Sequence, residues 1–509
     1  MAILGSIVKS AIDIKHTLTP EREDYQNIQI EQLRKLLSKA NATAFGLYYQ
    51  FETLLRADDP VKAFQESVPI VDYDTMNSRW WLQQQIAPDI TWPGKPEYFA
   101  LSSGTTGKES KRIPVSQEML ESIRSVGIAQ AESLAKYDLP SGLFEKDILM
   151  WGSSAQLRRH PNGHLEGEIS GISTNNIPGW FSGFYKPGLE IASIEDWDER
   201  VLAIARQAPD WNVGAIAGIP SWVQMMLKYV IEYHHLDNIH QIWPALSIYV
   251  SGGIAFEAYR LSLENLMAHP LIYMDTYLAS EGFFAHTARP GTMAMKLALE
   301  HGIFYEFIPF DERGFDGAGN LLPEPETFTI GEVKEGQDYA LIVSTPAGAW
   351  RYMIGDTIKF TNIQEMEIVI SGRTKYFLNV VGAQLSEEKM NAAMQALSEK
   401  LDIAINEFAV AAVQDEHGNF FHQWVVGADK EFDEQEAVLQ LDHLLQGINK
   451  NYGVARRKAL KGVKLKGLPT ETFYRWLEAN KKKGGQVKVP KVMDEDKMKA
   501  FLAFASQVN

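Results

Sequence analysis

Residues 98–111 read YFALSSGTTGKESK, an apolar run followed by a loop of small and hydroxylated residues and then by lysines. The apolar part predicts a strand, and Ser116 is suited to cap a helix beyond the loop. Small residues let backbone N–H groups approach phosphate oxygens, and hydroxyl groups add donors. An ordinary Gly/Ser turn needs no such set of hydroxyl groups and lysines. The stretch therefore predicts a phosphate-binding loop, although its spacing is not that of the mononucleotide P-loop. The predicted contacts are Ser102, Ser103, Gly104, Thr105 and Thr106.

Around this stretch the apolar pattern predicts a layered α/β protein. The first hundred residues favour helices, as in Ile30–Leu37, and short apolar runs then alternate with helical stretches. The runs are Ile148–Trp151, Val213–Ala217, Leu246–Val250 and Leu271–Met274. Strand character continues over Ala340–Ile370, and the composition of Ser371–Arg373 indicates a connector. A smaller α/β unit follows, with strands predicted at Phe408–Val413 and Phe421–Val426 and a helix at Glu434–Ile448.

The length, net charge and cysteine content of the chain exclude several classes of function. The 509 residues exceed one ordinary domain, and we expect a boundary near 371–385, which gives domains 1–375 and 376–509. The 65 acidic against 49 basic residues give a net charge of −16, so nucleic acid is not an expected partner. The chain has no cysteine, which excludes a thiolate nucleophile. It shows no signal peptide and no apolar run of about 20 residues, so we expect a cytoplasmic protein without a membrane partner.

A second motif follows the apolar run Leu271–Met274 and reads DTYLASEG over residues 275–282. The Glu281 carboxylate at the end of a strand is suited to hold Mg²⁺ against phosphates. Tyr277 is suited to cover a flat base. Taken alone, an ordinary strand-end turn with a solvated glutamate is the better explanation of these residues.

A third motif, WRYMIGD, covers Trp350–Asp356 after another predicted strand. A single carboxylate such as that of Asp356 can accept hydrogen bonds from ribose hydroxyl groups. A Gly-Asp turn is the plainer explanation when this motif is taken alone. His160 and His164 also lie four apart, but the intervening Pro161 and Gly163 argue against a metal-binding helix face.

In this order the three motifs resemble those of acyl-adenylate-forming enzymes. The closer resemblance, over nearly the whole chain, is to the Gretchen Hagen family of auxin-responsive acyl acid–amido synthetases. The family's nucleotide loop matches Ser102–Thr106, and further matching segments are Ser38–Gly46, Val68–Tyr73, Gly167–Gly171 and Ala217–Trp222. Its Tyr-x-x-Ser-Glu segment matches Tyr277, Ser280 and Glu281, and its Tyr-x-x-Gly-Asp segment matches Tyr352, Gly355 and Asp356.

The resemblance implies a large N-terminal multi-layer α/β domain of the adenylate-forming type and a smaller, mobile C-terminal α/β domain. It implies a ligase that uses ATP and Mg²⁺ to activate a small-molecule carboxylic acid as acyl-AMP, and then conjugates the acyl group to an amino acid. Glu281 is the implied metal ligand and, with the C-terminal Lys488, a catalytic residue. The implied nucleotide contacts, beyond the loop, are Ser251, Gly252, Gly253, Tyr277, Ser280, Asp356 and Arg373. Trp180 and Trp222 are candidates for the acyl pocket, although aromatic residues serve equally well as core.

One position departs from the family pattern. Where relatives often have a lysine that meets the ATP phosphates, this chain has Gln384, and Lys488 is the best substitute. A lysine in solvent is the competing interpretation of Lys488. Gln384 keeps open a non-catalytic sensor of a nucleotide or acyl acid as one alternative to the amide-forming ligase. A ligase that forms a thioester with coenzyme A is a second alternative, because such ligases share the Ser-rich loop.

Overall fold

The computed structural model divides into two compact units, each with its own hydrophobic core. The described residues are 24–102, 110–179, 181–253, 256–316, 319–374, 378–380, 383–385, 387–415, 419–449, 452–453, 455–456, 460–479 and 489–508. The first unit comprises Met1–Ile254, Leu266–Gly314 and Leu322–Val369. The second comprises Ala255–Asn265, Phe315–Leu321 and Ile370–Asn509.

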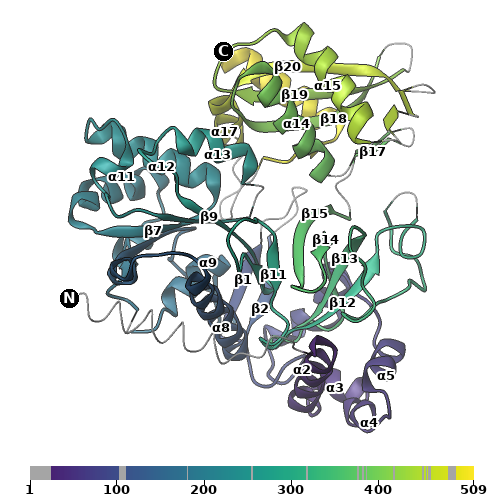
Figure 1. Ribbon diagram of the computed structural model, residues 1–509. Coiled ribbons are helices and arrows are strands. Elements are labelled where there is room, and N and C mark those ends of the chain that lie inside the picture. The colour runs from purple at the N-terminus through teal and green to yellow at the C-terminus, as the bar shows by residue number, and fades with distance from the viewer. Residues whose placement is uncertain are drawn as a thin grey trace. The chain divides into compact units, whose positions relative to one another are not determined.

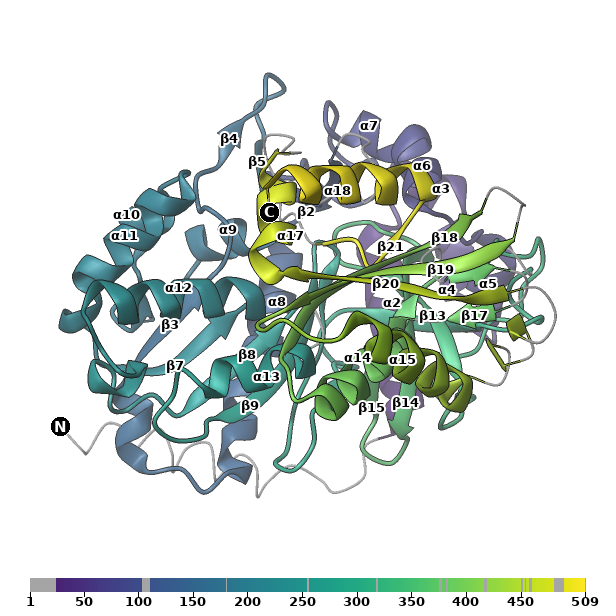
Figure 2. The ribbon, with the colours of Figure 1, turned by 90° about the horizontal axis from the view of Figure 1, so that it is seen from above.

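An eleven-stranded sheet organises the first unit (Figure 1). In spatial order its strands are β12 (Phe304–Pro309), β13 (Asp338–Ser344), β14 (Tyr352–Asn362), β15 (Glu367–Arg373), β11 (Met295–Leu297), β10 (Gly282–His286), β9 (Ile272–Ala279), β8 (Ile248–Gly252), β7 (Val213–Gly218), β3 (Asp147–Trp151) and β6 (Tyr185–Lys186). Strands β12, β13 and β14 pair antiparallel, whereas β9, β8, β7, β3 and β6 pair in parallel. Helices α11 (Trp197–Gln207) and α12 (Pro220–Tyr233) lie over the parallel half (Figure 2). The predicted alternation of buried strands and helices is confirmed.

A four-stranded sheet contains the strand that precedes the predicted phosphate-binding loop. Its order is β2 (Lys111–Val115), β1 (Tyr98–Ser102), β5 (Leu165–Gly167) and β4 (Arg158–Arg159). Strands β1 and β2 are antiparallel, with Ser102 opposite Lys111. Ser116 then caps α8 (Gln117–Ser133), because its Oγ accepts the Met119 N–H at 3.0 Å. The predicted strand and helix cap are therefore correct, whereas residues 103–109 of the predicted loop lie outside the described residues.

Helices before β1 and between the strands complete the first unit. They are α2 (Tyr25–Ala40), α3 (Ala44–Tyr48), α4 (Phe51–Leu55), α5 (Pro60–Ser67), α6 (Tyr73–Met76), α7 (Leu82–Gln84), α9 (Ile169–Asn175) and α10 (Leu189–Ala192). The longest, α2, buries Leu33, Leu36 and Leu37, as its periodicity predicts. Gln29 fixes this helix to the sheet edge: its Nε2 donates to the Ile303 carbonyl at 3.0 Å, and its Oε1 accepts the Tyr305 N–H at 2.8 Å.

The second unit is a four-stranded sheet with helices on both faces. The order is β20 (Leu460–Pro469), β19 (Phe420–Ala428), β18 (Ile405–Gln414) and β21 (Val492–Met493). Phe408 and Val410 of β18 face a core with α14 (Glu387–Leu401) and α15 (Glu434–Ile448). Ala409 and Ala411 face the other core, with α17 (Thr470–Ala479) and α18 (Glu495–Val508). Burial on both faces explains why Phe408–Val413 of this strand is apolar at consecutive positions rather than at alternate ones.

Helix α13 (Glu257–Glu264) belongs to the second unit although it lies between β8 and β9 in the sequence. Ser262 Oγ donates to Asn406 Oδ1 at 2.6 Å, and the Tyr259 hydroxyl donates to the Glu407 carboxylate. Both acceptors lie at the start of β18, and both tyrosine and glutamate are buried. This exchange of a helix between units leaves no pattern in the sequence, because it depends on partners more than 140 residues away.

One local prediction is wrong: Ser371–Arg373 does not form a connector, because β15 continues through Arg373. The competing explanation of the third motif, a Gly-Asp turn, does not hold either, because Gly355 and Asp356 lie inside β14. Gly355 and Asp356 lie at an irregularity of β14, because its pairing with β13 shifts register between the Thr357–Ala340 and Met353–Ile342 pairs. Among the described residues, no helix is both long and apolar enough to cross a membrane.

Candidate active site

Two motifs that are 79 positions apart meet through Tyr277 and Asp356. Tyr277 lies near the end of β9 and Asp356 lies in β14, and the Tyr277 hydroxyl donates to Asp356 Oδ2 at 2.7 Å. The Tyr277 ring is 4% exposed and packs edge-on against Phe284, with 5.0 Å between centroids. The tyrosine thus fixes the orientation of the carboxylate that the sequence assigns to the ribose.

Glu281 lies in the tight turn between β9 and β10, and it is buried. The Tyr352 hydroxyl donates to Glu281 Oε1 at 3.2 Å. Burial raises the pKa of the Glu281 carboxyl above its usual 4.5, and the nearby negative charge of Asp356 raises this pKa further. The charge of Lys111 acts in the opposite direction and lowers it. Glu281 makes no ion pair with any residue that the structure describes.

Lys111 brings the first motif to the same place. It begins β2 directly opposite Ser102, and its Nζ lies 5.2 Å from the centroid of the Tyr73 ring. The positive charge of Lys111 and the negative charge of Asp356 both shift the pKa of Glu281, so charged residues from all three motifs interact electrostatically. The charge of Lys111 is evident from the sequence, but its effect on Glu281 and the Tyr352–Glu281 hydrogen bond are not.

Ser251, Gly252 and Gly253 lie at the carboxyl end of β8, beside β9. Thr276 Oγ1 donates to the Ser251 carbonyl at 2.8 Å. A Cβ atom on Gly252 would lie 2.6 Å from Thr276 Oγ1, so only glycine fits there. Gly253 has a φ of +83°, which also favours glycine. Ligands of parallel α/β sheets bind at this carboxyl edge.

The remaining predicted residues have different positions. Ser280 directly precedes Glu281 in the turn, and Arg373 ends β15 in the second unit. Trp222 is half-buried in α12 and packs edge-on against Trp197, with 5.2 Å between centroids. Outside the described residues lie Ser103, Gly104, Thr105, Thr106, Trp180 and Lys488, and the side chain of Gln384.

Comparison with known protein families identifies the chain. Models of the GH3 (Gretchen Hagen) family match along it: the N-terminal domain at residues 15–208, the central domain at 296–371 and the C-terminal domain at 388–497. The chain belongs to the GH3 family. The resemblance that the three motifs indicate is thereby confirmed.

Individual relatives are distant. Jasmonoyl–L-amino acid synthetase JAR6 of Nicotiana attenuata is 23% identical over 452 residues, which cover 74% of each chain. Indole-3-acetic acid-amido synthetases of Arabidopsis thaliana and Oryza sativa match with 24% to 30% identity. Those matches span only 25% to 30% of the length of these relatives.

Solved structures extend the comparison to the fold. The acyl acid amido synthetase AtGH3.15 in complex with 2,4-DB superposes with a TM-score of 0.78 at 17% identity, covering 97% of this chain and 96% of that chain. A 2-hydroxyisobutyryl-CoA ligase in the postadenylation state superposes with a TM-score of 0.58 at 12% identity, covering 95% and 91%. The predicted fold, a large N-terminal α/β domain of the adenylate-forming type with a smaller C-terminal α/β domain, is confirmed.

Proposed function

We propose that this GH3 family member is an active enzyme, an ATP-dependent acyl acid–amido synthetase. It activates a small-molecule carboxylic acid as acyl-AMP and transfers the acyl group to the amine of an amino acid. The observation that carries this proposal is the convergence of Lys111, Glu281 and Asp356, one charged residue from each motif. Two relatives are named an indole-3-acetic acid-amido synthetase and a jasmonoyl–L-amino acid synthetase, and these names support the amide product over a thioester.

The first half-reaction brings two anions together. The substrate carboxylate attacks the α-phosphorus of ATP, the bond to the β-phosphate oxygen breaks, and pyrophosphate leaves. Catalysis must therefore come from positioning and charge neutralisation. We assign the phosphates to Ser102–Thr106 and Lys111, and the ribose to Asp356, which Tyr277 holds in place. The adenine lies against Ser251–Gly253 at the carboxyl end of β8.

Glu281 fits a Mg²⁺ ligand. Its carboxylate is a hard oxygen donor, it is buried, and burial raises its pKa, so a cation at this position would relieve an unfavourable negative charge. One carboxylate suffices, because Mg²⁺ in such sites takes its other ligands from phosphates and water. When bound, Mg²⁺ supplies positive charge that stabilises departing pyrophosphate. Tyr352 orients Glu281 for this role.

The second half-reaction needs no protein nucleophile, in keeping with the lack of cysteine. The amine attacks the acyl carbon, the bond to the AMP oxygen breaks, and the amide and AMP leave. We assign Lys488 as the C-terminal catalytic residue, Arg373 to the hinge between domains 1–375 and 376–509, and Trp180 and Trp222 to the acyl pocket. A cytoplasmic location stays a prediction.

The test is ATP–pyrophosphate exchange with a broad panel of carboxylic acids, followed by product analysis with amino acids and coenzyme A supplied together. We expect exchange with at least one acid and an amide as the product. Exchange followed by a thioester alone would replace the amide synthetase by a coenzyme A ligase. ATP binding without exchange on any acid would favour a nucleotide sensor.

A further inference from the structure

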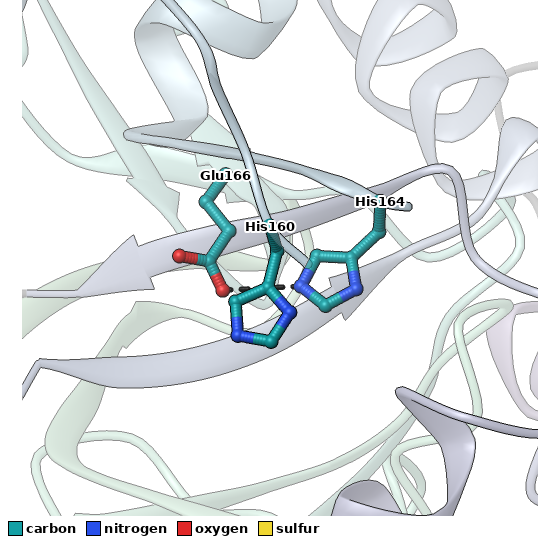
Figure 3. Close-up of side chains that lie close together, drawn as sticks. All are labelled: His160, His164 and Glu166. Carbon is teal, nitrogen blue, oxygen red and sulfur yellow. Dashed lines mark hydrogen bonds and ion pairs between the residues drawn. The ribbon is translucent and has the colours of Figure 1, made fainter. Parts of the chain in front are cut away.

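Three side chains with metal-binding groups lie on one face of the β4–β5 hairpin (Figure 3). Arg159 pairs with Leu165, so the next pair along the hairpin is His160 with His164. The His160 N–H donates to the His164 carbonyl at 2.9 Å. Glu166 follows His164 by two residues, and alternate residues of a strand share a face. Pro161 and Gly163 exclude a helix here, but they permit the tight hairpin that brings both histidines together.

The three groups are close enough to share one ion. His164 Nε2 lies 3.1 Å from Glu166 Oε1, and one ligand atom from each of the three residues lies within 4.8 Å of the others. A tetrahedral ion with bonds of about 2.0–2.2 Å separates its ligand atoms by roughly 3.3–3.5 Å. His164 and Glu166 therefore already stand at nearly the separation that such an ion requires.

His160 must turn to complete the set. Its ring stacks on that of His164, with 4.4 Å between centroids and 9° between planes, whereas an ion binds in the plane of each imidazole. His164 is 3% exposed and packs against Phe99, so it is fixed. His160 is half-buried, and its ring accepts one hydrogen bond from the described residues, from the Asn162 N–H to Nδ1 at 3.2 Å. Rotation of the His160 ring breaks this bond and the stacking on His164, at a place where water can accept the Asn162 N–H instead.

Arg112 supports the carboxylate from outside the set. Its Nε donates to Glu166 Oε1 at 2.9 Å, while Oε2 accepts no hydrogen bond from any residue that the structure describes. Such outer contacts hold a ligand in place for a metal. Arg112 lies on β2, so the hairpin, β1 and β2 would be joined through Glu166. The guanidinium charge also opposes a second cation, which limits the affinity.

We propose that His160, His164 and Glu166 bind one divalent transition-metal ion of the zinc class, with water as the fourth ligand. Two imidazoles and a carboxylate suit zinc and its neighbours better than Mg²⁺. The ion joins the two arms of the β4–β5 hairpin, which belongs to the same sheet as β1. This site is separate from the residues assigned to acyl-adenylate formation, and it does not depend on that function.

The experiment uses the untagged full-length chain, stripped with a chelator and dialysed against Zn²⁺ or Co²⁺. We expect one ion per chain by elemental analysis, and the intense visible absorption of four-coordinate cobalt. His160→Asn should weaken zinc binding about tenfold or more, since it removes a ligand. The matched control is His235→Asn, which changes an exposed histidine whose φ of +55° asparagine tolerates; its zinc affinity should equal that of the wild type.

Thermal melting supplies a second measurement. Zinc should raise the melting temperature of the wild type and of His235→Asn, and leave that of His160→Asn unchanged, because an ion that binds the folded state stabilises it. Fewer than one ion per wild-type chain would overturn the proposal whatever the variants do. Equal zinc affinity of His160→Asn and His235→Asn would overturn it as well, and would leave a hydrogen-bonded cluster of purely structural role.

Discussion

Two buried glutamates, one in each unit, accept a hydrogen bond from a tyrosine hydroxyl, but only one of them forms an ion pair with a described residue. Glu407 in the second unit accepts from Tyr259, and its Oε2 pairs with Lys491 Nζ at 2.9 Å. Glu281 in the first unit accepts from Tyr352, and it has no ion pair among the described residues. Both side chains are nearly excluded from solvent.

The difference separates a carboxylate that stabilises the fold from one that awaits a ligand. A buried charge is tolerated when a partner of opposite charge neutralises it, and Lys491 neutralises Glu407. Glu281 instead has a raised pKa caused mainly by burial, which marks a negative charge that its surroundings do not neutralise. Such perturbed groups concentrate at functional sites. The same substitution in the two glutamates should therefore have opposite consequences.

Glu407→Gln should give the largest loss of stability. It removes the negative charge and leaves the half-buried Lys491 without a counter-ion; the loss of one member of a fully buried pair costs roughly 3–5 kcal/mol, and partial exposure of the lysine lowers this cost. Urea unfolding followed by circular dichroism measures the change. Glu281→Gln is the matched control and should change stability little or increase it. An equal loss in both variants would remove the distinction between the two carboxylates.

Glu281→Gln should instead abolish most of the activity. Loss of the metal-binding charge should slow ATP–pyrophosphate exchange about 100-fold or more, because charge neutralisation contributes several kcal/mol to such transition states. The folded fraction, checked by circular dichroism, should stay that of the wild type. Wild-type exchange in this variant would show that Glu281 is not the metal ligand.

Asp356→Ala should weaken ATP binding about ten- to hundred-fold, since hydrogen bonds to a charged group contribute roughly 1.5–3 kcal/mol. Tyr277→Phe keeps the ring packed against Phe284 and removes only the hydroxyl that orients Asp356, so its effect should be smaller. Calorimetry with ATP and 2′-deoxy-ATP tests both variants. Each should lose part of the preference for the ribose hydroxyl, and unchanged ATP affinity in folded Asp356→Ala would displace the ribose from this residue.

The sequence predicts the strands and motifs of this site better than their contacts. Apolar runs place β3, β7, β8 and the start of β9, because parallel strands buried on both faces are rich in apolar residues. The antiparallel β13 is found in the same way, because it is buried along most of its length. Small and polar residues inside a strand are misjudged, as at Ser371–Arg373, because the backbone stays extended there whatever the polarity of the side chains. Tyr352 and Glu281 lie 71 residues apart, and only the folded sheet brings them within hydrogen-bonding distance. The inclusion of α13 in the second unit is hidden for the same reason.

The smallest effect concerns the pH at which activity falls on the acid side. The proposed reaction needs ionised Glu281, whose pKa burial raises above 4.5 and Lys111 lowers in part. A raised carboxyl pKa means that the folded protein takes up the proton at a higher pH, so activity should fall as the pH drops through this value. Lys111→Gln removes the lowering charge, so the acid limb of exchange should move to higher pH. Lys111→Arg keeps the charge and should leave the limb near its wild-type position, even if both variants exchange more slowly. Exchange rates for the two variants between about pH 5 and 8 make the comparison, and coincident acid limbs would mean that Lys111 does not control the ionisation of Glu281.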